Sequence, residues 1–152
     1  ELNVNITRNL SGVSEGRQRV VYVDSDADNS MKLAADGDIN TYWRTVHNQF
    51  YLAPYPHEIQ VSLAKEAKVK GIKYTPRQDS AEGRIAKYEI YLSQDGKEWG
   101  KAVASGTFKN SKEAQTVEFT PHQARYVKLQ ALSAADGGKQ AAVSELEILT
   151  AE

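Results

Sequence analysis

The sequence has no cysteine among its 152 residues. Disulfide bonds, zinc–thiolate sites and thiol nucleophiles are therefore excluded. The absence does not fix a compartment, because many bacterial secreted proteins also lack cysteine.

An excess of charge and a long apolar run are also missing. Nineteen Lys and Arg stand against 20 Asp and Glu, which gives a formal net charge of −1. The chain thus lacks the basic footprint of a nucleic-acid binder or of a polybasic lipid-binding surface. No apolar run approaches the roughly 20 residues that span a bilayer. The chain begins at Glu1 without a signal-like segment, so we expect a mature or excised domain whose targeting signal lies outside this sequence.

Strand-like alternation is what the sequence does contain. A length of 152 residues suits one domain with its own core. Apolar residues fall at every second position in several short runs, which places one set against a core and the other toward water. These runs are Glu58–Leu63, Tyr88–Leu92, Thr116–Phe119, Tyr126–Leu129 and Glu145–Leu149. Many short strands predict an antiparallel β-sandwich or barrel.

Turn signals separate these runs, with one exception. Asp95-Gly96 is a strong tight-turn pair, because Gly adopts positive φ without steric cost. The segment from Asp24 to Tyr55 is polar, about 30 residues long, and without a convincing strand. Loops of that length inside a compact domain are usually functional.

Six sequence blocks stand in a fixed order along the chain. They are Ala35–Trp43 (ADGDINTYW), Pro56–Ile59 (PHEI), Tyr74–Asp79 (YTPRQD), Tyr88–Trp99 (YEIYLSQDGKEW), Ala124–Leu129 (ARYVKL) and Val143–Ile148 (VSELEI). In order and spacing they resemble the discoidin, or coagulation factor 5/8 type C, family. The resemblance is to its bacterial branch, carbohydrate-binding module family 32, and covers roughly residues 20–149.

The resemblance implies a fold and a class of function. The implied fold is all-β: a jelly-roll-like, galactose-binding-like antiparallel sandwich of about eight main strands, forming a single domain over residues 1–152. Similar domains accompany sialidases, hexosaminidases, fucosidases and galactose oxidase. We therefore expect a non-catalytic module that binds glycans, tethered to a secreted, periplasmic or cell-surface bacterial protein that acts on glycosides. The alternative is an adhesion module that binds protein or phospholipid, because family membership alone does not fix the ligand.

A structural calcium ion is the expected cofactor. Asp36-Gly37-Asp38 with Thr41 offers hard oxygen ligands on a tight loop, which suits Ca²⁺. An EF-hand is excluded, because Thr41 replaces the required Gly and His47 replaces the required Glu. The resemblance adds a main-chain carbonyl near Ala34 and the carboxylate of Glu145 to the ligand set. An Asx turn that needs no metal is the competing interpretation, and we favour calcium.

The resemblance also implies a sugar site on loops at one end of the sandwich. Arg77 matches the family's arginine, and Glu82 matches a later polar residue. Where relatives carry a His this chain has Arg44, and where they carry an aromatic it has His47. Phe50 and Tyr51 are candidates for a replacement stacking surface.

Two arginines leave the charge of the sugar open. Arg forms bidentate bonds with carboxylates, so Arg44 and Arg77 make an acidic sugar a candidate beside a galactoside. Neutralisation of both arginines by Asp79 and Glu82 is the alternative. We expect Arg77 to be a surface residue that contributes little to the core.

Catalysis is not expected. Gly12–Gly16 (GVSEG) matches the nucleophile-elbow pattern around Ser14, but that motif requires a strand-to-helix turn, and a strand-like run follows here. A second acidic cluster, Asp24, Asp26 and Asp28, is a candidate for a second ion, but it lacks a Gly at position 6 and a carboxylate at position 12, so we favour a solvated loop. Most other acidic residues are expected on outward strand positions, where they serve solubility.

Overall fold

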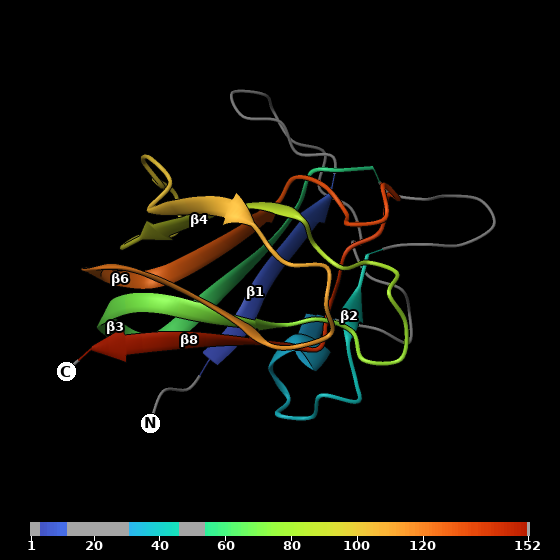
Figure 1. Cartoon of the computed structure of the whole chain (residues 1–152). Helices are drawn as coiled ribbons and strands as arrows, with labels where there is room; N and C mark the ends of the chain where they lie inside the picture. Colours follow the sequence, from blue (N-terminus) through green and yellow to red (C-terminus); the bar gives the residue numbers. More distant parts are fainter. Residues whose placement is uncertain (1–3, 12–30, 46–53, 152) are drawn as a thin grey trace.

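The computed structural model describes residues 4–11, 31–45 and 54–151, which form antiparallel strands and one short 3-10 helix (Figure 1). The predicted all-β class is confirmed. In this part of the chain the strands are β1 (Val4–Ser11), β2 (Trp43–Arg44), β3 (His57–Thr75), β4 (Lys87–Ser93), β5 (Ala104–Thr107), β6 (Gln115–Ala131), β7 (Ala142–Val143) and β8 (Glu145–Ala151), and the helix is η1 (Met31–Ala35). Among these residues there is no helix with the length and apolar character to cross a membrane.

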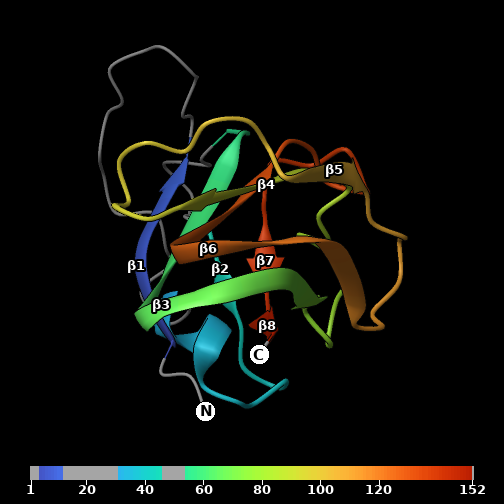
Figure 2. The ribbon, with the colours of Figure 1, turned by 90° about the vertical axis from the view of Figure 1, so that its left-hand side faces the viewer.

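Two long strands, β3 and β6, connect the layers of the sandwich. They pair with each other in two stretches, separated by an irregularity between Ser62 and Ala67 of β3. Figures 1 and 2 show β3 turning back at this break, so that its two halves lie in different layers. The first half pairs with β1 and the second half with β8. The first layer continues through β6 to β4 and β5.

The alternation in the sequence correctly predicts the core. Most apolar residues at alternate positions of β3, β4, β6 and β8 are buried in one cluster with Trp43, and Leu92, Val117 and Phe119 are partly buried and pack against it. Its strand members include Ile59, Val61, Leu63, Tyr88, Ile90, Val127, Leu129, Leu146 and Ile148. A period of two thus places one side of each strand in the interior, as expected for a half-buried sheet.

The expectation that acidic strand residues face solvent is wrong for Glu58. Glu58 is 1% exposed and Gln60 is 3% exposed, so both faces of this stretch of β3 are covered. The Gln60 amide donates a hydrogen bond of 2.6 Å to Glu58 Oε2. Burial of a carboxylate requires such partners, because an isolated charge away from water is costly.

Two strands lie where no strand was predicted. β1 uses residues of the N-terminal segment that matched no known pattern, and a register shift between Ile6 and Arg8 interrupts its pairing with β3. β2 lies inside the segment that was expected to lack strands, and it pairs with β7. Both runs are too short or too irregular for alternation to reveal them.

Candidate functional site

Three segments distant in sequence meet at one end of the sandwich. Arg44 of β2 pairs with Ala142 of β7, and the Thr45 amide donates to the Ala141 carbonyl oxygen at 3.0 Å. The Ala142 amide donates to the Gly83 carbonyl oxygen at 2.9 Å. The signature segment, the loop that follows β3 and the last loop before β8 are therefore held together by main-chain hydrogen bonds. This end carries Arg44, Arg77 and Glu82, three of the residues predicted to contact sugar.

Gly83 allows this close approach. Its φ is +81°, and a Cβ there would lie 2.8 Å from the Cβ of Ala142. A residue with a side chain would be strained in its backbone and would clash with β7. Sequence reasoning singled out Glu82 next to it and missed the glycine.

The hydroxyl of Tyr74 forms hydrogen bonds to two of these segments. Tyr74 is fully buried. Its hydroxyl donates to the Ala142 carbonyl oxygen at 3.2 Å and accepts a hydrogen bond of 3.1 Å from the Ile85 amide. Burial is the main cause that raises the pKa of Tyr74, so the hydroxyl remains a donor. Two loops of the site are thereby tied to one rigid core side chain.

Arg77 lies at the centre of the candidate site, and it is more enclosed than its sequence context predicted. Its side chain is only 12% exposed, so the expectation of a surface arginine is wrong. The guanidinium lies 4.4 Å from the ring centroid of Tyr42, in the geometry of a cation–π contact. The physical reason for the burial is this packing, which covers one face of the guanidinium group.

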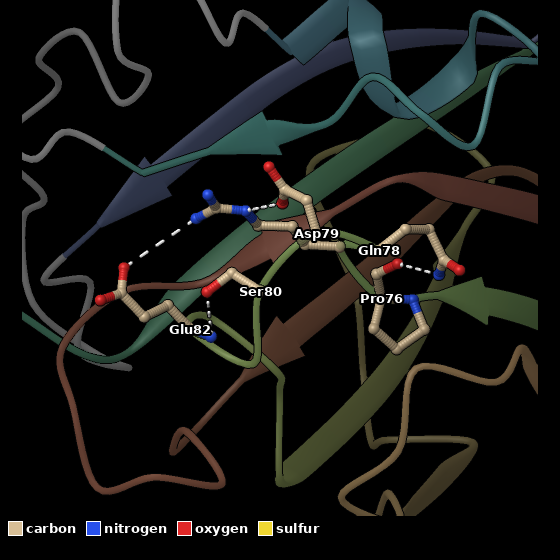
Figure 3. Close-up of polar contacts among 6 residues, drawn as sticks. Pro76, Gln78, Asp79, Ser80 and Glu82 are labelled. Carbon is tan, nitrogen blue, oxygen red and sulfur yellow. Dashed lines mark hydrogen bonds and ion pairs between the residues drawn. The ribbon is translucent and has the colours of Figure 1, made fainter.

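Two carboxylates flank the guanidinium (Figure 3). Arg77 Nε donates to Asp79 Oδ1 at 2.5 Å, and Arg77 Nη1 lies 3.9 Å from Glu82 Oε2. Nη1 is buried and has no hydrogen-bond partner in the described part of the chain. Arg77 is therefore held in place by Tyr42 and Asp79, and its Nη1 is ion-paired with Glu82 without a hydrogen bond.

Arg44 acts on the same carboxylate. The hydrogen bond from Arg77 is the main cause that lowers the pKa of Asp79, and the positive charges of Arg77 and Arg44 contribute. Both arginines thus lie close enough to stabilise the ionised form of Asp79. Asp79 and Glu82 are 65% and 60% exposed at their side chains, so they form the solvent side of the cluster. The structure brings Arg44, Arg77 and Glu82 into one polar cluster, and their contact with sugar stays a prediction.

Two aromatic residues anchor the last loop of this end. The Tyr55 hydroxyl donates to the Gln140 carbonyl oxygen at 2.7 Å, and His57 Nε2 lies 2.6 Å from the Lys139 carbonyl oxygen. The two rings are 4.3 Å apart in an edge-to-face arrangement. His57 is 1% exposed, and burial lowers its pKa to about 4 although the bond to Lys139 opposes the shift. His57 is therefore a neutral structural residue.

The predicted calcium loop is compact and rich in oxygen. The Thr41 hydroxyl oxygen lies 2.5 Å from Asp36 Oδ2 and 3.0 Å from the Asp38 carbonyl oxygen. Ligands at 2.3–2.6 Å from one Ca²⁺ lie at separations of this order from each other. The donor set of the loop fits that ion, although no group of three or more Asp, Glu, His or Cys side chains converges in the described residues.

Glu145 joins the loop from β8. Both of its carboxyl oxygens lie 3.1 Å from the Gly37 amide, which donates to them. Burial and the adjoining Asp36 carboxyl raise the pKa of Glu145 to about 7. Burial also disfavours ionised Asp36, but hydrogen bonds from Thr41, the Asp38 amide and Glu145 outweigh it and lower the pKa of Asp36. Two carboxyl groups that share a proton in this way fit a divalent cation between them.

Not every predicted residue can be placed. His47, Phe50, Tyr51 and Ser14 lie outside the residues that the structure describes, as does the acidic cluster at residues 24–28. Ala34 is buried beside the loop, and the side chain of Asp38 caps the Asn40 amide at 2.9 Å.

Sequence reasoning missed Tyr42 and Tyr74 as supports of the site. A signal for Tyr42 was present, because it stands next to Trp43 in the first block. No pattern in the sequence links Tyr74 to its two loops.

Fold and site together define a class: a β-sandwich domain with a fixed polar cluster on the loops at one end. The model of the F5/8 type C domain family matches residues 18–146. The chain belongs to this family.

Sequence and structure comparisons agree. A sialidase from Micromonospora viridifaciens is 38% identical over 140 residues, which cover 90% of this chain and 22% of that protein. Thus the chain spans about a fifth of the length of the curated relatives that match most of it.

Two solved structures share the fold. A CBM32 module from Clostridium perfringens in complex with GalNAc-β-1,3-galactose has a TM-score of 0.77 at 26% identity, with 98% of this chain and 95% of that chain covered. The family 32 module of C. perfringens NanJ, in complex with galactose, has a TM-score of 0.74 at 28% identity, with 97% and 92% covered.

Proposed function

We propose that this domain is a non-catalytic carbohydrate-binding module whose site lies around Arg77. The proposal rests on the contacts that fix the Arg77 side chain. Tyr42 and Asp79 hold the guanidinium in place, and the exposed carboxylate of Glu82 lies 3.9 Å from its Nη1. Such a fixed cluster of donors and acceptors is suited to sugar hydroxyl groups, because pre-ordering lowers the entropic cost of binding.

The charge of the cluster favours a neutral sugar over an acidic one. Arg44 and Arg77 carry two positive charges, and the exposed Asp79 and Glu82 carry two negative ones. Asp79 already occupies Nε of Arg77, which removes one of the two bidentate edges of the guanidinium, and Glu82 lies 3.9 Å from Nη1 on the other. An acidic ligand would also approach two exposed carboxylates and be repelled. A neutral hydroxyl group, in contrast, can accept from the guanidinium and donate to a carboxylate.

The relatives support this class of ligand. The two solved modules hold galactose and a GalNAc-galactose disaccharide, and the related sialidase is a longer protein of which this domain matches a fifth. We accordingly propose a galactoside-type sugar as ligand and a secreted or surface-bound bacterial parent that acts on glycans. Such tethering adds avidity to a weak single site.

Calcium is proposed as a structural ion of the loop at Asp36. Asp36 and Glu145 would supply carboxylates, Thr41 its hydroxyl, and Ala34 and Asp38 their carbonyl oxygens. The ion would separate the two carboxyl groups and tie the loop to β8. Residues 42–44 follow this loop directly, so the ion would also support Tyr42 beneath Arg77.

The test is a glycan array on the domain in calcium-containing buffer, with the variant Arg77→Lys beside the wild type. Lysine keeps the charge but loses the planar face and the fork of donors. We expect neutral terminal galactosides to bind the wild type and to bind Arg77→Lys more weakly. Lys101→Gln, an exposed change at the other end of the sandwich, should bind as the wild type does.

Preferential binding of uronic or sialic acids would contradict the neutral assignment. Retention of vesicles or of a protein partner, with no glycan bound, would replace the proposal by the adhesion function.

A further inference from the structure

A second hollow lies at the end of the sandwich opposite Arg77. β4 begins at Lys87 on the Arg77 side and ends at Ser93, and the loop that follows turns at the far end (Figure 1). Between this loop and β6 is a groove of about 560 Å³. We call it the far groove and define it by Gln94, Glu98, Trp99, His122 and Gln123. Its size falls within the range of sites for small ligands.

The far groove is lined by an aromatic ring, that of Trp99, which packs against a buried lysine. Lys128 Nζ lies 4.7 Å from the ring centroid of Trp99 and 4.6 Å from that of Tyr91. Lys128 is only 8% exposed, so its ammonium group is enclosed between the two rings. Cation–π contacts of a desolvated ammonium fix the position of the indole. Trp99 therefore offers a pre-oriented apolar surface to the groove.

The loop that carries Trp99 is fixed as well. Asp95 Oδ1 accepts hydrogen bonds from the amides of Lys97 and Glu98 at 2.8 and 3.0 Å, and from the Ser93 hydroxyl at 2.9 Å. Asp95 is thus committed to the turn and is not available for a ligand. The fixed loop lowers the ordering cost of any molecule that binds on it.

The rim, in contrast, is polar and uncommitted. The side chains of Glu98, His122 and Gln123 are exposed, and within the described residues they make no hydrogen bond or ion pair. Together they supply an acceptor, an imidazole and an amide beside the indole. An apolar ring face flanked by such groups matches a pyranose, which has C–H faces and a belt of hydroxyl groups.

The same lining excludes an anionic ligand. The residues of the groove include two carboxylates, Asp95 and Glu98, and no Lys or Arg. A uronic or sialic acid would meet repulsion from both carboxylates, and the nearby ammonium of Lys128 is enclosed between Trp99 and Tyr91 and does not line the groove. We infer that the far groove is a second sugar site, selective for a neutral pyranose and independent of Arg77. Two sites at opposite ends would let one domain bridge two glycan chains.

Tryptophan signals make the inference testable site by site. The chain has only two tryptophans, Trp43 in the core near Arg77 and Trp99 in the far groove. Their indole N–H groups give two cross-peaks in a proton–nitrogen correlation spectrum, assigned with Trp99→Phe. The probes are lactose, N-acetylgalactosamine and cellobiose, with galacturonic acid as the anionic comparison, each to about 30 mM, some thirtyfold above a weak Kd of ~1 mM.

We expect at least one neutral sugar to shift the Trp99 signal saturably, in the wild type and equally in Arg77→Lys. His122→Ala and Gln123→Ala should each weaken that shift about five- to tenfold, the effect of one hydrogen bond. Glu118→Gln, an exposed change elsewhere on β6, should not. A Trp99 signal that no neutral sugar moves would overturn the inference. Shifts in His122→Ala and Gln123→Ala that equal those of the wild type would overturn it as well. Loss of the Trp99 shift in Arg77→Lys would show that the two sites are not independent.

Discussion

A fall in pH should destabilise the domain through His57, which holds the last loop of the proposed sugar site. This side chain is 1% exposed and holds the Lys139 carbonyl oxygen at 2.6 Å. Burial lowers its pKa to about 4, against an ordinary value of 6.5. A depressed histidine pKa means that the fold favours the neutral ring. The resulting stability is fully present above pH 6.5 and is lost as the pH falls toward 4.

The size of this loss of stability follows from the difference between the two pKa values of His57. Each pH unit in that window costs about 1.4 kcal/mol of the free energy of unfolding. A fall from pH 6.5 to pH 5 therefore costs about 2 kcal/mol, which corresponds to a decrease in Tm of roughly 4–8 °C for a domain of this size. Glu145 acts with the opposite sign, because its raised pKa stabilises the fold at low pH and that stability is lost as the pH rises through about 7.

The assay separates these two groups with one variant. Glutamine in His57→Gln keeps a donor for the Lys139 carbonyl oxygen but does not titrate. Thermal melts of the wild type and of His57→Gln are measured from pH 8 to pH 5 in chelator. Glu145 contributes equally to both, so the difference in Tm isolates His57. We expect the Tm of the wild type to fall by several degrees more than the Tm of His57→Gln as the pH falls from 6.5 to 5. A difference in Tm that stays constant over this range would refute the reasoning.

Three further changes test the supports of the site. Calcium at a hundredfold excess over its Kd should stabilise the domain by about 2.7 kcal/mol; melts with calcium and with chelator should differ, and the difference should shrink in Glu145→Gln. Gly83→Ala should lower the free energy of unfolding in denaturant by about 1–3 kcal/mol more than Gly137→Ala does. Both glycines have a positive φ, but only a side chain at Gly83 would clash with β7. Equal losses of stability in the two variants would contradict this contact. Tyr74→Phe should cost about 1–3 kcal/mol, because the buried Ile85 amide loses its acceptor; an unchanged midpoint would show that the hydroxyl is dispensable.

The sequence predicts the interior of this fold better than its edges. Alternation in β4, β6 and β8 places Ile90, Leu129 and Ile148 in the core, because a period of two fixes the inward face. It fails for Glu58, where both faces are covered and polarity no longer indicates exposure. It also misses β1, whose pairing is interrupted by a register shift.

The candidate site divides in the same way. Family resemblance points to Arg77, Glu82 and the calcium loop, because their motifs are local in sequence. The contacts of Tyr42 with Arg77 join residues 35 positions apart, and no local pattern encodes them. The neutrality of the cluster likewise depends on the hydrogen bond between Asp79 and Arg77, which the sequence offers only as one of two alternatives.

The central claim is that a fixed guanidinium at Arg77 binds a neutral sugar. Isothermal titration with a neutral galactoside at 50 and 300 mM salt tests it most directly. The wild-type site, Arg77→Lys and Glu82→Gln are compared in a His122→Ala/Gln123→Ala background, which weakens the far groove so that the Arg77 site is measured. Melts of each variant accompany the titration, because the Arg77 side chain is only 12% exposed. We predict a Kd of ~1 mM for the wild type, nearly independent of salt, and severalfold weaker binding for both variants at unchanged Tm for Glu82→Gln. Equal affinity for all three proteins, or affinity that falls steeply with salt, would contradict the account.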